Sequence, residues 1–350
     1  MPPHRTASVR PPPFIGVLLA LPMVLFVSCT ATGGALGASS ILRSVDNDLF
    51  AKSDDQYSAG LSISYVGPPE RTFSDTALPS WLGGFLDDHW PFAAENEHFV
   101  IYSISQRLFT PTDLEATEVV KDDLPYSALL YATATAGSQG ADVLDAISLS
   151  LGVVGPLALG EEVQSAVHAL TGSTDPKGWD NQLENEPLLN VGLEHRQRLM
   201  RFGRSGGAGG DLLAGLSASA GNLETQATLA STVRLGWRVP SNFQMQSEFL
   251  AEDSLGLRPW TPTPEKPFFY AFAGFAGTLL ANAIYLDGNT FADSHSVEHD
   301  PYVLRGSLGL AWQYGRLLVS TVYERATLPW DQPEGLDHED YLRFGISWDF

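Results

Sequence analysis

The run GEEVQSAVHALT at residues 160–171 holds the side chains best suited to acid–base chemistry. Its residue types predict a helix in a chain that otherwise alternates apolar and polar residues. In such a helix Glu161, Gln164 and His168 share one polar face, because they stand at i, i+3 and i+7. A neutral imidazole there would act as a general base toward water, with the Gln164 amide hydrogen-bonding the same reacting group. The alternative is a surface helix in which His168 has no special role.

Oxygen ligands suited to a metal ion are crowded in SVDNDLFAKSDDQYSAGLS, residues 44–62. They belong to Asp46, Asn47, Asp48, Asp54 and Asp55. Several such oxygens hold hard divalent cations such as calcium, although the spacing here is not that of an EF-hand loop. The alternative is that these residues form Asx turns in a loop.

Two later segments hold further polar side chains. GWDNQLENEP, residues 178–187, is typical of a turn that packs its indole and fixes the loop with Asx hydrogen bonds. In residues 281–301, the Asp-Gly-Asn run at 287–289 predicts a tight turn, and residues 293–295 supply the residue types of a Ser/His/Asp triad. Neighbours in sequence rarely reach triad geometry, so this segment is interpreted as a structured long loop. The sequence contains no P-loop, HExxH or CxxC motif.

The elements that must position these side chains are β-strands. Segments with period two are LSISYV (61–66), FVIYSISQRLF (99–109), DAISLSLGVV (145–154), LLAGLSASA (212–220), ATLASTVRLGW (227–237), FFYAFAGFAGTL (268–279), RGSLGLAWQY (305–314), RLLVSTVYERA (316–326) and YLRFGISWDF (341–350). With ranges near 126–134 and 190–202 they make roughly a dozen strands. Gly315 and Gly221 stand in short links that predict two tight hairpins.

The last strand indicates where the sheet lies. Alternate positions up to the last residue are held by Leu342, Phe344, Ile346, Trp348 and Phe350. This pattern is typical of a lipid-facing strand that closes an outer-membrane barrel, and eight Trp and eleven Tyr would supply the interfacial girdles. The sequence therefore predicts an all-β transmembrane barrel, with the edge strand of a soluble β-sandwich as the alternative.

The N-terminus predicts export from the cytoplasm. Arg5 and Arg10 precede an apolar run over residues 14–27, and small residues follow, in the order of a signal peptide. Residues 1–38 are therefore interpreted as a signal peptide with an approximate cleavage point. Residues 39–350 are interpreted as a single outer-membrane β-barrel domain, because no linker interrupts them.

The composition excludes further classes of protein. The only cysteine, Cys29, lies within the predicted signal peptide, so the mature chain would have no disulfide. The alternative is a lipoprotein that is acylated at Cys29. The formal net charge of -21 indicates that the chain does not bind a nucleic-acid backbone, which needs clustered Lys and Arg.

Four segments, in this order, resemble the outer-membrane lipid A 3'-O-deacylase family over nearly the whole mature chain. They are NDLF with DDQYSAG, SQRLFTPTD, LGVVGPLALGEEVQSAVHALTG with KGWDNQLENEP, and IYLDGNTFADSHSV. The resemblance implies a 12-stranded antiparallel barrel with a short helix near an active site between barrel wall and lumen, at the level of the outer leaflet. It also implies calcium-dependent removal of the 3'-linked acyl chain of lipid A. The implied partners are lipopolysaccharide, the outer-membrane bilayer and the barrel assembly machinery.

Site residues follow from the same resemblance. Asn47 and Asp48 match the family's Asn-Asp pair near the calcium and oxyanion region, His168 matches its catalytic histidine, and Gln164 matches the glutamine one turn earlier. These parts suit ester hydrolysis, with His168 deprotonating water and calcium stabilising the oxyanion. Two alternatives remain, a non-catalytic barrel that keeps the helix as a plug and a soluble periplasmic β protein.

Overall fold

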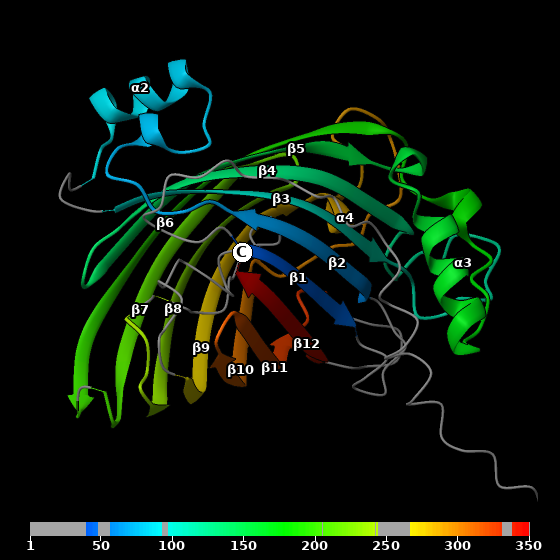
Figure 1. The fold of residues 1–350 in the computed structure, drawn as a ribbon. Helices are drawn as coiled ribbons and strands as arrows, with labels where there is room; N and C mark the ends of the chain where they lie inside the picture. Colours follow the sequence, from blue (N-terminus) through cyan, green and yellow to red (C-terminus); the bar gives the residue numbers. More distant parts are fainter. Residues whose placement is uncertain are drawn as a thin grey trace, which may run out of the picture.

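In the computed structural model, the described part of the chain forms twelve antiparallel strands that close into a barrel (Figure 1). The structure describes residues 40–47, 57–92, 97–204, 206–241, 243, 267–330 and 338–349. The strands are β1 Ser40–Asn47, β2 Tyr57–Val66, β3 Glu97–Phe109, β4 Ser127–Gln139, β5 Val143–Val154, β6 Glu186–Gly203, β7 Ala208–Gly221, β8 Glu224–Trp237, β9 Phe268–Ala283, β10 Tyr302–Tyr314, β11 Leu317–Thr327 and β12 His338–Asp349. Each strand pairs with its neighbour in sequence, and β12 closes the barrel against β1.

The predicted fold class is confirmed. Each of the eleven predicted segments overlaps a strand, and the links at Gly221 and Gly315 are tight hairpins. Strand β1 is the one described strand that the sequence did not predict. The predicted signal peptide lies outside the described residues and stays a prediction.

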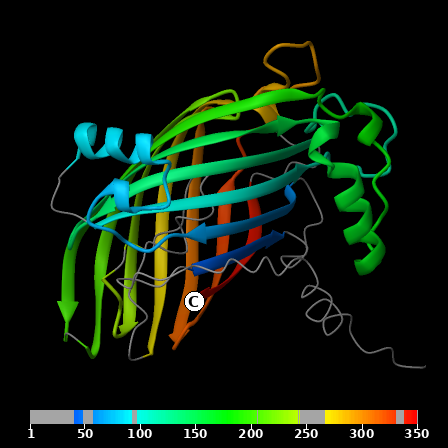
Figure 2. The same ribbon diagram turned by 45° about the horizontal axis from the view of Figure 1, so that its top comes forward.

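Short helices lie in the connections between strands. The α-helices are α2 Ser80–His89, α3 Gly160–Thr171 and α4 Ile284–Asp287, and the 3-10 helices are η2 Phe73–Asp75, η3 Pro156–Ala158 and η4 Trp179–Asn181. Figure 2 shows α2 and α3 at opposite ends of strands β3 to β5, both outside the barrel wall. Among the described residues, no helix is both long enough and apolar enough to cross a membrane.

Alternation along the strands separates an apolar outer face from a polar lumen. On β12, Phe344, Ile346 and Trp348 are exposed, as predicted for a lipid-facing row. On β4 and β5, Thr133 and Ser150 point inward and their hydroxyl oxygens lie 2.8 Å apart. Apolar side chains outside and polar ones inside are what a barrel in a bilayer requires.

The two ends of the barrel differ. We call the end where β1 begins and β12 ends the terminal rim, and the opposite end the loop rim. An aromatic belt of exposed side chains lies near the terminal rim and consists of Trp237, Phe269, Trp312, Tyr314 and Trp348. Strand pairing places Phe269 between Trp237 and Trp312. Such belts mark the boundary between the acyl chains and the headgroups of a bilayer.

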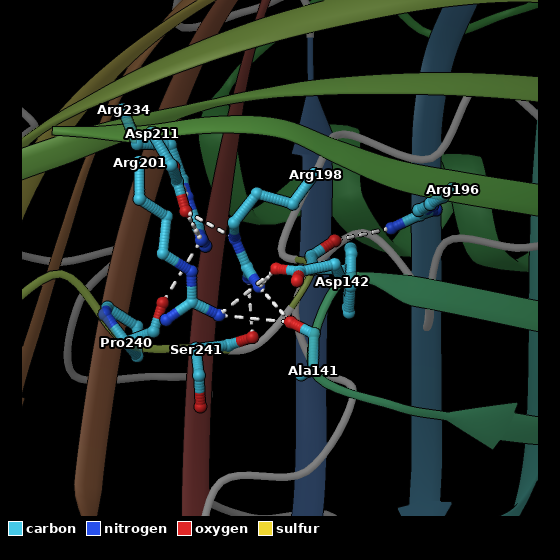
Figure 3. Close-up of polar contacts among 10 residues, drawn as sticks. Ala141, Asp142, Arg196, Arg198, Arg201, Asp211, Arg234, Pro240 and Ser241 are labelled. Carbon is cyan, nitrogen blue, oxygen red and sulfur yellow. Dashed lines mark hydrogen bonds and ion pairs between the residues drawn. The ribbon is translucent and has the colours of Figure 1, made fainter. Parts of the chain in front are cut away.

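A buried charge cluster fills the lumen near the terminal rim (Figure 3). The carboxylate of Asp211 on β7 accepts hydrogen bonds from Arg198 on β6 (Nε to Oδ2, 2.9 Å) and from Arg234 on β8 (Nε to Oδ1, 2.8 Å; Nη2 to Oδ2, 2.6 Å). All three side chains are almost fully buried. One carboxylate therefore joins three adjacent strands from the inside.

The same arginines hold the chain that follows β8. The guanidinium of Arg234 donates to the carbonyl of Pro240 (3.1 Å), and that of Arg198 donates to the carbonyl of Ser241 (2.5 Å). Arg196 donates to the carbonyl of Phe243 at 2.9 Å. The described residues after β8 therefore fold inward, across the lumen at the terminal rim.

Candidate active site

Helix α3, which carries His168, packs on the outer surface of the barrel near the loop rim (Figure 1). Beneath it lie Leu108 of β3 and Ala128 of β4, which face outward because they alternate with inward-facing neighbours. A Cβ on Gly160 would lie 2.5 Å from the Cβ of Ala128 and 2.5 Å from the Trp179 ring. Glycine at this position therefore allows the helix to approach the wall.

The chain enters α3 in an unusual backbone conformation. Leu159, the residue before the helix, has φ 59° and ψ 37°, a left-handed conformation that costs a non-glycine residue on the order of 1 kcal/mol or more. Gln106 of β3 donates to the carbonyl of Ala158 at 2.6 Å and ties this turn to the wall. Glu161 and Glu162 follow in the first turn, where negative charge is favourable to the helix dipole.

His168 is only 7% exposed and has a defined tautomer. Its Nδ1 hydrogen-bonds the carbonyl oxygen of Thr174. Because a carbonyl can only accept, Nδ1 carries the proton and Nε2 is the basic nitrogen of the neutral ring. The backbone that orients the ring turns at Gly172, whose φ of 78° ends the helix.

Gln164, one turn before His168, is 2% exposed. Its Oε1 accepts a hydrogen bond of 2.8 Å from the indole Nε1 of Trp179. Its Nε2 has no hydrogen-bond partner among the described residues. A buried amide N–H without a partner is costly in a folded protein, so this group is poised to donate to a ligand.

Trp179 is held by the connection between β3 and β4. Its ring centroid lies 5.0 Å from that of Tyr126, and Asn181 in the same 3-10 helix donates to the carbonyl of Thr117 at 2.8 Å. Burial raises the pKa of Tyr126 to about 12, against a smaller opposing effect of a backbone hydrogen bond, so its phenol stays neutral. The predicted packed turn is confirmed, and its indole also fixes the Gln164 amide.

Asn47 is the last residue of β1 and lies at the same rim as α3. Its neighbour Asp46 pairs with Gly60, the adjacent Ala59 pairs with Leu108, and Leu108 pairs with Ala128. Three strand spacings of about 4.8 Å put the backbone of Asn47 roughly 14 Å from that of Ala128, against which α3 packs. The side chain of Asn47 and the whole of Asp48 lie outside the described residues.

The predicted calcium ligands stay a prediction for the same reason. Among the described residues, no group of three or more His, Cys, Asp or Glu side chains is arranged to hold a metal ion. The donors that the sequence offers, an amide oxygen of Asn47 and the carboxylate of Asp48, are hard oxygen ligands of the kind calcium takes.

Two expectations about α3 need correction. The helix lies outside the wall, neither as a plug nor between wall and lumen, because the outward Leu108 and Ala128 give it an apolar seat. The face with Gln164 and His168 is its most buried face rather than a solvated one, because Trp179 pairs with Gln164 Oε1 and the carbonyl of Thr174 pairs with His168 Nδ1.

The loop over residues 281–301 is structured as predicted. His295 Nε2 donates to the carbonyl of Asp123 at 2.7 Å, and Ser294 Oγ accepts from the backbone N–H of Asn289 at 2.7 Å. Both side chains therefore fix the loop and do not form a triad, as the sequence predicts.

A closed antiparallel barrel with apolar outward rows, a polar lumen and an aromatic belt is the architecture of an integral outer-membrane protein, here with a buried His and Gln pair on its outer wall. The family model described as "Outer membrane protein LpxR" matches residues 18–350, so the chain belongs to the LpxR family. This is the lipid A deacylase family that its motifs resemble. The protein is located in the outer membrane, and the alternative of a soluble periplasmic protein is wrong.

A solved structure supports the fold. The chain is similar to LpxR from Salmonella typhimurium, with 21% sequence identity, a TM-score of 0.70, and coverage of 89% of this chain and 100% of that chain. It is less similar to the beta domain of the Bordetella autotransporter Brka, with 10% identity, a TM-score of 0.45, and coverage of 90% and 100%. No curated protein matches the chain by sequence.

Proposed function

We propose that the protein hydrolyses an ester that links an acyl chain to lipid A, the 3'-O-linked acyloxyacyl group by its family resemblance, with His168 as general base. The observation that carries the proposal is the buried pair of Gln164 and His168 on the outer wall, the side of the barrel that faces lipid. A pore function would need only the lumen, and neither side chain lies there.

The orientation in the membrane supports this substrate. The loop rim carries the long connections over residues 110–126, 155–185 and 284–301, whereas three of the five links at the terminal rim are short turns at 140–142, 204–207 and 315–316. Outer-membrane barrels place long loops outside the cell and short turns in the periplasm. Helix α3 then lies beside the outer leaflet. We expect the barrel assembly machinery to insert the chain in this orientation.

The reaction uses the two described side chains in different roles. The Nε2 atom of His168 removes a proton from water as the water oxygen attacks the ester carbonyl carbon. The Nε2–H group of Gln164 donates to the carbonyl oxygen as it becomes negative. When the carbon–oxygen bond to the sugar breaks, the imidazolium returns its proton to the leaving alkoxide. The products are a fatty acid and a sugar hydroxyl.

Calcium completes the proposal. Held by Asn47 and Asp48, it would act as a Lewis acid that stabilises negative charge on the carbonyl oxygen.

Purified protein with lipid A and calcium is expected to yield lipid A that has lost one ester-linked acyl chain, detected by mass spectrometry. Chelation with EDTA should stop the reaction and added calcium should restore it. Unchanged lipid A at every calcium concentration would contradict the deacylase. Deacylation that continues in EDTA would contradict only the calcium requirement.

Replacing Trp179 by phenylalanine tests the positioning of Gln164. The variant keeps most of the ring but removes the indole N–H that holds Gln164 Oε1. We expect kcat to fall about tenfold with little change in KM, since the Gln164 amide loses its anchor and its Nε2–H group then stabilises the transition state less well, by about 1.4 kcal/mol. Trp330→Phe is the matched control, because the indole N–H of Trp330 has no partner among the described residues. Equal effects in both variants would indicate a packing role only.

A further inference from the structure

Helix α2, in the connection between β2 and β3, exposes large aromatic side chains far from the candidate active site. Trp81 is 73% exposed and Phe85 is 54% exposed, and they stand one helical turn apart on the same face. Leu82 and Leu86 flank them and are half-buried. An apolar surface of this kind on a rigid element marks an interaction site.

The opposite face of α2 packs against η2 and is hydrogen-bonded to it. Asp87 accepts hydrogen bonds from the backbone N–H groups of Phe73 (2.6 Å) and Ser74 (3.1 Å). A Cβ on Gly83 would lie 2.8 Å from the carbonyl oxygen of Phe73, so the helix is pressed against η2. These contacts fix the rotation of α2 about its axis. The polar contacts therefore face the protein, and the aromatic rings face outward.

The seat of α2 is the outward face of β3 and β4. Phe73 is fully buried between Trp90 and His98, with ring centroids 4.6 and 4.2 Å away. Trp90 donates its indole N–H to the hydroxyl of Ser138 at 3.1 Å. Tyr102, which alternates with inward-facing residues of β3, donates its hydroxyl to the carbonyl of Ala77 at 3.0 Å. The unit thus stands on the surface that continues into the lipid-facing wall.

The position of α2 along the barrel corresponds to the periplasmic interface of the bilayer. Residues 67–92 follow β2 at the terminal rim, which is also the rim of the aromatic belt. Figures 1 and 2 both show α2 outside the wall at this end. Tyr102 and its strand partner Tyr65 face outward there, as aromatic residues do at a membrane interface. The exposed face of α2 is therefore continuous with the established lipid interface.

We propose that α2 lies in the headgroup region of the periplasmic leaflet and inserts Trp81 and Phe85 between the acyl chains of zwitterionic phospholipids. The sequence SWLGGFLDDH supplies no Lys or Arg and two carboxylates, so attraction to anionic lipids does not drive the contact. Burial of aromatic surface drives the contact instead. The indole N–H of Trp81 stays within reach of headgroup oxygens.

Quenching of Trp81 by brominated lipid tests this contact. Full-length protein is placed in nanodiscs of zwitterionic phosphatidylcholine, with or without bromine on the upper acyl chain. The emission of Trp81 is the difference between wild type and Trp81→Phe. We expect bromine to quench it to about the same extent as the emission of Trp312, obtained in the same way from Trp312→Phe.

Trp312 belongs to the belt, so its quenching shows that the bromine reports correctly. Trp81 emission that bromine leaves unchanged, while Trp312 is quenched, would overturn the proposal and leave the face for a protein partner. A nitroxide at Phe85→Cys gives a second measurement, expected to be more accessible to oxygen than to a water-soluble nickel complex, with Ala292→Cys, at an exposed position of the loop rim, as the aqueous reference. Reversed accessibility at position 85 would equally contradict it.

Discussion

Replacing His168 by alanine is expected to lower the rate of lipid A deacylation about 10²- to 10⁴-fold, because the reaction loses its general base. Mass spectrometry of lipid A from cells that express the variant should show the unmodified species. The barrel should still fold, as judged by its shifted mobility on unboiled gels, since α3 lies outside the strand pairing.

Two further variants separate chemistry from structure. His168→Asn offers an amide N–H toward the carbonyl of Thr174 but no base, so it should be as inactive as alanine. His195→Ala removes a histidine that bonds Asp145 on the outer surface of β5 and β6, and it should keep its activity. An active His168→Asn enzyme would show that His168 only holds the loop.

Replacing Asp211 by alanine is expected to lower the free energy of unfolding by about 3–5 kcal/mol, because two buried guanidinium groups lose their shared carboxylate. Urea-induced unfolding in micelles, followed by tryptophan fluorescence, measures the change. Asp340→Ala is the matched control, since Asp340 pairs with the exposed Arg325 and should have a much smaller effect. Equal stability of the two variants would mean that the lumenal cluster contributes little.

The sequence predicts the barrel well because alternation is a local signal. Each predicted segment carries its own period of two, and the helix over 160–171 is found with the predicted bounds. Strand β1 escapes prediction because SILRSVDN does not alternate cleanly. It is a strand because β2 and β12 pair with it on both sides, and these partners are remote in the sequence.

The site is predicted less completely. The spacing of Gln164 and His168 correctly places them on one face of α3, yet a helical pattern cannot tell that a neighbouring loop satisfies polar groups. Trp179 is 15 residues from Gln164, and only the folded connection brings its indole N–H to the amide. The orienting partner of His168 is a backbone carbonyl, which no residue type reveals. The roles of Asn47 and Asp48 stay predictions.

The position of α3 on the outer wall changes which concentration governs the proposed reaction. A substrate that reaches Gln164 and His168 sideways diffuses in two dimensions and never crosses the lumen. The rate then depends on the number of lipid A molecules per unit area of leaflet, not on their number per unit volume of solution. Divalent cations that bridge the phosphates of lipopolysaccharide pack it tightly in the leaflet. Such packing would slow lateral diffusion of the substrate to the site, as a more viscous solvent slows diffusion to a soluble enzyme.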